Sequence, residues 1–117
     1  MAKKGTVRLK RAYEEPSKDD GTRVLVERLW PRGVSKDRAA IDFWLKEVAP
    51  STELRKWYDH DLDKWEEFRR RYRQELKTQG EILERLRNEA RKGTVTLLFA
   101  AKDEERNNAV VLKEMLA

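Results

Sequence analysis

The chain has 117 residues, enough for one domain that buries roughly two thirds of the surface of the unfolded chain. Charged residues make up 42% of the sequence, against ~25% in an average soluble protein, and 27 Lys and Arg against 22 Asp and Glu leave a net charge of +5. The two signs are interleaved along most of the chain, which favours a solvated, ion-paired surface over a dedicated nucleic-acid face. Because the sequence contains no cysteine, disulfides, zinc fingers, iron–sulfur ligation and thiol catalysis are excluded.

Membrane and export signals are not found in the sequence. No stretch approaches the ~20 consecutive apolar residues of a transmembrane helix. The first residues, Met-Ala-Lys-Lys-Gly, are not followed by the apolar segment of a signal peptide. We therefore expect a cytoplasmic protein that does not bind membranes.

Three segments have the pattern of β-strands. Residues 6–13 alternate apolar and basic side chains, as an edge strand with one solvated face does. After a loop rich in turn-forming residues, residues 22–29 contain three consecutive apolar residues, Val24 to Val26, which indicates a strand covered on both faces. Residues 94–101 form a second, longer apolar run bounded by glycine and charged residues. We expect another buried strand there.

Helical signals occupy most of the remaining chain. Periodicity and capping residues predict helices at residues 36–40, 52–58, 63–76, 81–91 and 104–116, the last capped by Asp103. Residues 41–48 fit both a helix and a strand, and we prefer the helix. With a helical crossover between them, the two buried strands should run parallel. The sequence thus predicts one compact α/β domain over residues 1–117, with a small, mostly parallel sheet covered by helices.

A candidate ligand site follows from this topology. In a parallel α/β sheet the strand ends and the helix N-termini that follow them meet at one rim, and ligands bind there. The first buried strand brings Arg28, Trp30 and Arg32 to this rim, and the second brings Lys102 and Asn108. Guanidinium groups, and a lysine near a helix N-terminus, suit phosphate or carboxylate ligands. We predict a site for an anion or a nucleotide-like small molecule.

Two carboxylates at the same rim, Glu27 and Asp103, are candidates for general acid/base catalysis, with the arginines stabilising negative charge. The pattern has low specificity, because the sequence contains no Gly-rich phosphate-binding loop. The alternative interpretation is structural, with Arg28 and Arg32 paired to nearby carboxylates and fixing the turn. The sequence does not decide whether the protein is an enzyme, and it implies no particular cofactor.

Two other clusters of charged residues have plainer structural interpretations. His60, the one histidine, is flanked by Asp59 and Asp61, but a solvated turn between helices explains this better than a metal site. The basic run from Arg69 to Arg73 is the best nucleic-acid signal in the chain. Glutamates surround the run, which favours a charged outer helix face. A nucleic-acid or protein binding module using this run is therefore the second hypothesis, and no metal site is predicted.

Five blocks of sequence carry a family resemblance that covers nearly the whole chain. They are Arg-Val-Leu-Val-Glu-Arg-Leu-Trp-Pro-Arg-Gly at 23–33, Leu-Lys-Glu-Val-Ala-Pro-Ser at 45–51, Leu-Arg-Lys-Trp at 54–57, Trp-Glu-Glu-Phe at 65–68, and the segment 101–112 that begins Ala-Lys-Asp. In these blocks the chain resembles domain-of-unknown-function family 488 (DUF488), in its YeaO-like subgroup of small bacterial and archaeal proteins. The resemblance implies a compact α/β fold with the Arg-bearing and Lys-Asp-bearing strands side by side, and no established activity.

The chain departs from other branches of that family at the predicted rim. Those branches tend to carry Cys and Glu before the Lys-Asp pair and a Cys-His-Arg triplet after it. This chain has Phe99 and Ala101 at the first two positions, and Asn107, Asn108 and Ala109 at the triplet. Thiol, imidazole or metal chemistry is therefore not implied for this chain.

Overall fold

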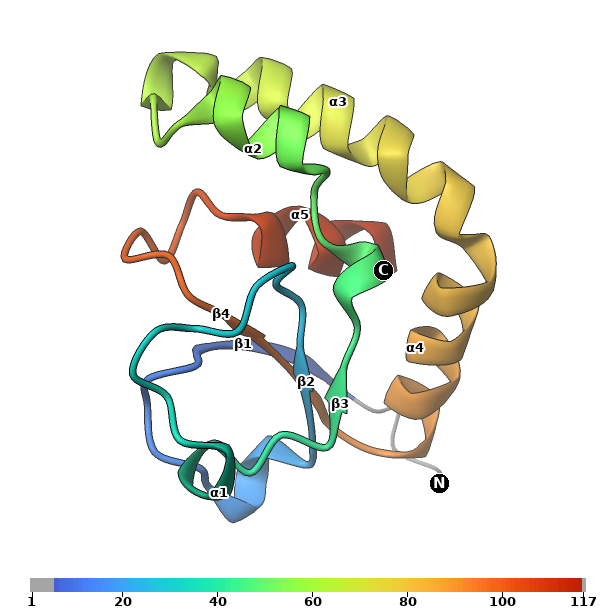
Figure 1. Cartoon of the computed structure of the whole chain (residues 1–117). Helices are drawn as coiled ribbons and strands as arrows, with labels where there is room; N and C mark the ends of the chain where they lie inside the picture. The colour runs from blue at the N-terminus through green and yellow to red at the C-terminus, as the bar shows by residue number, and fades with distance from the viewer. Residues whose placement is uncertain (1–5, 117) are drawn as a thin grey trace.

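A four-stranded, all-parallel sheet forms the centre of the computed structural model, with strand order β1-β4-β2-β3 (Figure 1). The strands are β1 (Val7–Arg11), β2 (Thr22–Leu25), β3 (Phe43–Trp44) and β4 (Val95–Phe99). The structure describes residues 6–116, so the N-terminal residues 1–5, where we expect no signal peptide, lie outside it. The predicted α/β class, the parallel direction and the edge position of β1 are confirmed.

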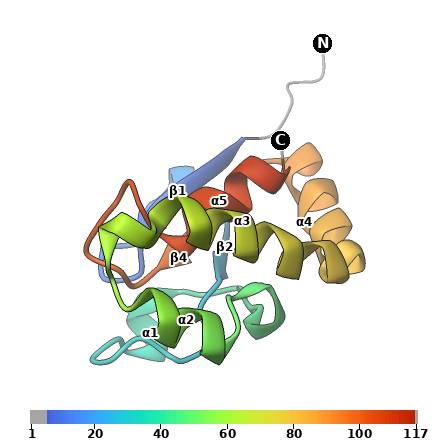
Figure 2. The same cartoon turned by 90° about the horizontal axis from the view of Figure 1, so that it is seen from above.

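Five α-helices are found in the described part of the chain. They are α1 (Lys36–Ala39), α2 (Thr52–Tyr58), α3 (Trp65–Leu76), α4 (Gly80–Lys92) and α5 (Asn108–Leu116). Helices α4 and α5 pack on the sheet, α3 packs on α5, and α2 packs on α3 (Figures 1 and 2). The helical layer thus builds outward from one face of the sheet and carries α2 above the strand ends. Among residues 6–116, no helix is both long enough and apolar enough to cross a membrane, and the cytoplasmic location stays a prediction.

Both faces of the sheet are covered, as the continuous apolar runs of β2 and β4 predict. Successive side chains of a strand point to opposite faces, so Val24 and Val26 enter the main core beneath the helices, while Leu25 faces the other side. There Leu25 packs in a smaller core with Ala12 and Leu98, covered by Trp30, Ile41 and Trp44. All five residues of β4 are buried, which identifies it as the centre of both cores.

Gly21 lets β2 begin directly beside β4. Its φ of +62° is in the left-handed region that favours glycine, and a Cβ there would lie only 2.1 Å from the carbonyl oxygen of Thr94. The backbone N–H of Thr22 donates to that same oxygen at 2.9 Å. Any side chain at position 21 would therefore push apart the first pairing of the two central strands.

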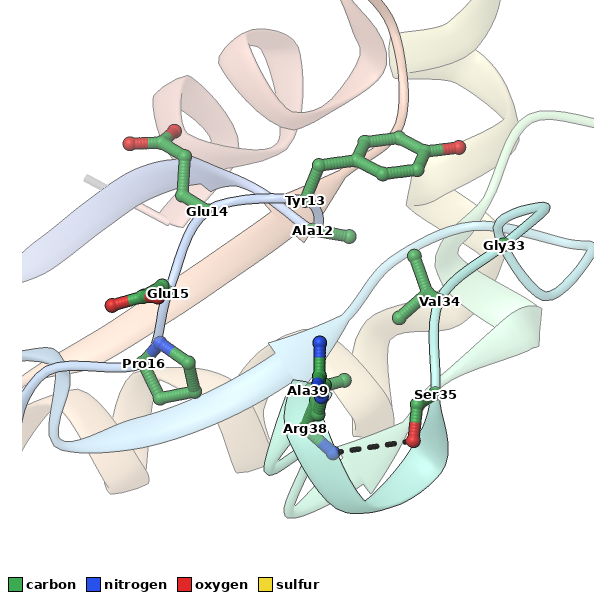
Figure 3. Close-up of a pocket in the computed structure, with 10 residues that line it drawn as sticks. All are labelled: Ala12, Tyr13, Glu14, Glu15, Pro16, Gly33, Val34, Ser35, Arg38 and Ala39. Carbon is green, nitrogen blue, oxygen red and sulfur yellow. Dashed lines mark hydrogen bonds between the residues drawn. The ribbon is translucent and has the colours of Figure 1, made fainter.

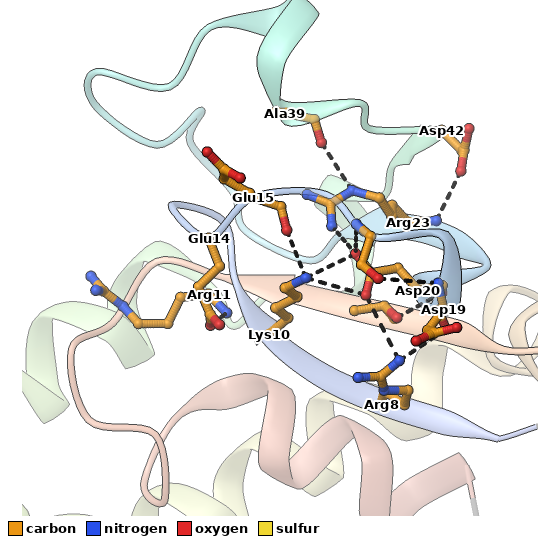
Figure 4. Close-up of polar contacts among 12 residues, drawn as sticks. Arg8, Lys10, Arg11, Glu14, Glu15, Asp19, Asp20, Arg23, Ala39 and Asp42 are labelled. Carbon is orange, nitrogen blue, oxygen red and sulfur yellow. Dashed lines mark hydrogen bonds and ion pairs between the residues drawn. The ribbon is translucent and has the colours of Figure 1, made fainter.

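A buried ion-pair network closes the same end of the sheet (Figure 4). The side chain of Asp20 is fully buried and pairs with Arg23 at 2.5 Å and with Lys10 at 3.1 Å, while Arg8 lies 3.8 Å away. Burial alone would raise the pKa of Asp20, but hydrogen bonds from the backbone of Ser17 and from the two closest cations bring the pKa below its ordinary value. The network fixes the loop between β1 and β2.

The prediction of a helix at residues 41–48 is wrong. Residues 43–44 form β3, and residues 46–48 form a single 3-10 turn. The backbone N–H groups of Asp42 and Leu45 donate to the carbonyls of Arg23 and Leu25, at 2.8 and 2.9 Å, which draws this segment into the sheet beside β2. These non-local hydrogen bonds favour the strand, although the local sequence also fits a helix.

The last helix begins four residues later than predicted, at Asn108 instead of Glu104. The carboxylate of Asp103 accepts hydrogen bonds from the backbone N–H groups of residues 105 and 106, both at 2.9 Å, so it closes a loop turn. The side chain of Asn107 takes the capping role instead, because its Oδ1 accepts from the N–H of Val110 at 3.1 Å.

Candidate functional site

A pocket of about 530 Å³ opens at the carboxyl ends of β2 and β4, and we call it the rim pocket. Its wall combines residues that follow these two strands, residues of α2 and its C-terminus, and the segment that leads into α5. The lining residues are Glu27, Leu29, Pro50, Thr52, Arg55, Lys56, Tyr58, Asp59, His60, Phe68, Ala100, Ala101, Arg106, Asn107 and Asn108. The pocket therefore lies at the rim where the sequence places a ligand site.

The carboxylate of Glu27 is held in this wall by the ends of both central strands. Its Oε2 accepts a hydrogen bond from the backbone N–H of Ala100 at 3.1 Å. The side chain of Asn108 also stabilises the charged form, and its Nδ2 donates to the carbonyl of Val26 at 2.7 Å. Burial raises the pKa of Glu27, and the Ala100 N–H, the charge of Arg55 and the Asn108 amide only partly oppose this. The result is a fixed carboxyl group that gains a proton more readily than an ordinary glutamate.

Tyr58 contributes a hydroxyl group that has no hydrogen-bond partner within residues 6–116. The side chain is 8% exposed, and its ring stacks on Phe68 with 4.5 Å between the ring centroids. Burial and the charge of Asp103 raise the pKa of Tyr58, so the hydroxyl keeps its proton. A buried hydroxyl without a partner is destabilising, which makes this group a donor suited to a bound ligand.

Three cationic side chains line the rim pocket. Arg55 and Lys56 come from α2, and no ion pair is found for either of them in the part of the chain that the structure describes. Arg106 comes from the segment before α5 and lies 4.0 Å from the carboxylate of Asp103. Two carboxylates on the wall, Glu27 and Asp59, leave the pocket with a cationic balance.

The start of α2 explains why these cations project over the rim. The side chain of Ser51 caps the helix by accepting from the N–H of Leu54 at 3.1 Å. The carboxylate of Glu75 in α3 accepts from both the backbone N–H and the hydroxyl of Ser51, at 2.8 and 2.7 Å. Helix α2 is therefore held to α3 at its N-cap, and the side chains of Leu54 and Tyr58 are buried.

Of the residues predicted to bind a ligand, Asn108 lines the rim pocket and four others lie elsewhere. Arg28 donates to the carbonyls of Pro50 and Ala49, at 3.1 and 3.2 Å, so it fixes the turn as the structural alternative holds, although its partners are carbonyls instead of carboxylates. Trp30 donates to the carbonyl of Val34 at 2.7 Å and lies in the small core on the other face of the sheet.

Arg32 and Lys102 are exposed, and no hydrogen bond or ion pair of either side chain is found among the described residues. Of the two carboxylates predicted as acid/base candidates, Glu27 lines the pocket. Asp103 lies outside the lining, and its hydrogen bonds to the loop lower its pKa below the ordinary value. The structure therefore separates the two carboxylates by position and by acidity.

The basic run in α3 is ion-paired. Arg70 and Arg71 both pair with Glu67, whose pKa their hydrogen bonds lower to about 2. Arg69 and Arg73 both pair with Glu114 of α5, at 2.8 and 2.9 Å. This pattern is the charged outer helix face that the sequence favours. As for metals, no group of three or more His, Asp or Glu side chains within residues 6–116 is placed to hold an ion.

A second pocket of about 540 Å³ lies between the loop after β1 and the segment around α1 (Figure 3). Its charged lining residues are Glu14, Glu15 and Arg38. The two glutamates outnumber the arginine, so this pocket suits an anion less well than the rim pocket does.

Relatives of known sequence match the chain along almost its whole length. It is 42% identical over 110 residues to "Uncharacterized protein YeaO" of Escherichia coli (strain K12), which covers 94% of this chain and 96% of that protein. It is 41% identical over 116 residues to "Uncharacterized protein Rv3073c" of Mycobacterium tuberculosis, covering 99% and 98%. No solved structure matches. A family model described as the "Inactive DUF488-N3 subclade" matches residues 6–117, and the chain therefore belongs to the DUF488 family.

Proposed function

We propose that this DUF488 protein binds an anionic, nucleotide-like small molecule in the rim pocket. The observation that supports this most directly is the group of cations on the pocket wall, since Arg55 and Lys56 face no carboxylate within ion-pair distance in the described chain. The pocket is also of suitable size, because small-molecule sites usually enclose roughly 300–1,000 Å³. Its mixture of apolar and convergent polar groups is typical of such sites.

Binding is a better proposal than catalysis for this chain. The matching family model is described as inactive, and this agrees with the asparagines and alanine at positions where other branches carry Cys, His and Arg. If the pocket has catalytic activity, Glu27 is a better acid/base candidate than Asp103, because it lines the pocket and has a raised pKa.

The nucleic-acid or protein binding module remains the alternative, through the run from Arg69 to Arg73. Its ion pairs with Glu67 and Glu114 make it a weaker proposal, because a phosphate would have to displace bound carboxylates. This alternative predicts nucleic-acid binding that weakens steeply with salt and is lost when Arg69 and Arg70 are changed to Glu.

A thermal-shift screen of nucleotides, sugar phosphates and dicarboxylates tests the proposal. The informative variant is Arg55→Ala/Lys56→Ala, and its matched control is Arg32→Ala/Lys102→Ala, which removes the same charge from exposed residues outside the pocket. A ligand at about 100 times its Kd adds about 2.7 kcal/mol to the free energy of unfolding, which raises Tm by several degrees.

We expect this rise in the wild type and in the control, and not in Arg55→Ala/Lys56→Ala. A screen without any rise in the wild type would reject the proposal. An equal rise in both double variants would also reject it, since the cations of the pocket would then take no part in binding.

A further inference from the structure

The rim pocket holds a carboxylate beside its cations, and this combination says more about the ligand than a cationic wall alone. The hydrogen bond from the Ala100 N–H fixes Glu27 from the side of the strands, and the Asn108 amide stabilises its charged form. In the described chain no cation lies within 4.0 Å of this carboxylate, although the charge of Arg55 reaches it. A ligand in the pocket therefore meets Glu27 as a hydrogen-bond acceptor that no cation neutralises.

The other polar side chains beside Glu27 are mostly engaged already. The Nδ2 of Asn107 donates to the carbonyl of Asp103 at 2.8 Å, and its Oδ1 caps α5. The amide of Asn108 holds the end of β2. The hydroxyl of Tyr58, by contrast, is buried and has no partner within residues 6–116. Among the polar lining side chains that are not exposed, Glu27 and Tyr58 therefore keep unused hydrogen-bonding capacity, and Phe68 lies against the tyrosine ring.

Glu27 and Tyr58 line the same pocket as three cations, and this combination matches a ligand of two parts. Arg55, Lys56 and Arg106 suit a phosphate group, whose oxygens accept from forked and ammonium donors. Glu27 suits hydroxyl groups that donate, and it repels a second anionic group. Tyr58 can both donate to and accept from a hydroxyl.

We propose that the ligand of the rim pocket is a phosphate monoester of a polyhydroxylated molecule, whose hydroxyl groups donate to Glu27 and pair with the Tyr58 hydroxyl. This inference rests on the proposed function of the pocket. Glu27 is then the specificity-determining residue: it favours phosphate esters that carry hydroxyl donors over those that carry a second carboxylate. Free sugar phosphates and nucleotides share this chemistry.

Isothermal titration calorimetry with five probes tests the inference. The probes are ribose 5-phosphate, 2-deoxyribose 5-phosphate, 2-phosphoglycolate, a ribonucleoside 5′-monophosphate and inorganic phosphate. We expect ribose 5-phosphate to bind the wild type about tenfold more tightly than the 2-deoxy compound, because a hydrogen bond to a charged group is lost. Phosphoglycolate, with its carboxylate, should bind more weakly than either sugar phosphate.

The variant Glu27→Gln keeps an oxygen that can accept from the Ala100 N–H, and it removes the charge. In this variant we expect the preference for the ribose compound over the 2-deoxy compound to fall to less than about threefold, and the affinity for phosphoglycolate to rise. Tyr58→Phe should weaken ribose 5-phosphate and leave inorganic phosphate unchanged. The ribonucleotide compared with ribose 5-phosphate shows whether a base adds affinity, which separates the two sources of the ligand.

The outcomes distinguish the two proposals. If none of the five probes binds, the proposed function itself fails. If the phosphate esters bind regardless of their hydroxyl groups, and Glu27→Gln leaves their ranking unchanged, the pocket is an anion site and the inference on its ligand is overturned. The ranking of probes on the wild type decides the matter even if a variant fails to fold.

Discussion

A carboxylate lies beside each end of β2, and the surroundings shift the pKa values of the two groups in opposite directions. Asp20, just before the strand, is fully buried, pairs with Arg23 and Lys10, and has a lowered pKa. Glu27, just after the strand, is met by neutral amide donors and has a raised pKa. The ion pairs of Asp20 hold parts of the fold together. Glu27 has no ion pair in the described chain, so its carboxylate can still accept hydrogen bonds from a ligand.

Replacing Asp20 should have the largest effect on stability. Asp20→Ala leaves Arg23, which is 3% exposed, without its counter-ion, and the Nη2 of that arginine already lacks a partner in the described chain. We expect the free energy of unfolding, measured by urea denaturation, to fall by about 3–5 kcal/mol. The control Asp19→Ala, at an exposed neighbour, should change it by less than about 0.5 kcal/mol. Similar small losses in both variants would show that the buried network does not stabilise the fold.

Two buried tyrosines also differ in the hydrogen bonding of their hydroxyl groups. The hydroxyl of Tyr72 donates to the carbonyl of Val48, whereas that of Tyr58 has no partner in the described residues. Tyr72→Phe should lower the free energy of unfolding by about 1–3 kcal/mol, because it leaves a buried carbonyl unpaired. Tyr58→Phe should leave it unchanged or raise it by about 1 kcal/mol. The two variants are compared by urea denaturation at one pH, and equal losses would mean that the Tyr58 hydroxyl has a partner in solution.

Glu27 and Asp20 should also change the pH dependence of stability in opposite directions, and this effect is smaller than those of the substitutions above. Because the folded protein raises the pKa of Glu27 above the ordinary 4.5, the stabilising contribution of its protonated form is present below that pH and is lost as the pH rises through the raised value. Asp20 behaves oppositely: its contribution is present above the ordinary value of 3.8 and is lost as the pH falls through the lowered pKa.

Glu27→Gln removes one of these titrations. Relative to the wild type, the free energy of unfolding of the variant should therefore rise as the pH rises from below the ordinary value of 4.5 through the raised pKa of Glu27. Urea denaturation at several pH values in this range measures the difference. A difference that does not change with pH would contradict the raised pKa.

The sequence predicts the central sheet because β2 and β4 are continuous apolar runs with a helical crossover between them. It does not predict β3, since two residues carry too little periodicity and their pairing with β2 is non-local. The beginning of α5 is missed for another reason. Asp103 and Asn107 are both good capping residues, and local rules do not choose between them.

The sequence indicates where the rim pocket lies better than it indicates which residues line it. The rim and two of its residues, Glu27 and Asn108, follow from the strand ends. The direction of the Arg28 side chain does not follow from the strand ends. Strand β2 ends at Leu25, and Arg28 is bound by carbonyls of a distant segment. The cations of α2 are missed although the helix itself is predicted. Their place over the rim depends on the packing of α2 on α3, and helical periodicity says nothing about that.

The position of β4 has a consequence for how the chain folds. This strand is the last in the sequence, yet it lies between β1 and β2, so Val95 pairs with both Val7 and Thr22. During synthesis the helices α3 and α4 can form from local contacts, but β1 has no neighbouring strand until β4 emerges from the ribosome. The sheet, and with it the rim pocket, therefore closes as a late and cooperative event. A chain that stops before β4 would carry Arg55 and Lys56 of α2 without a pocket to place them in.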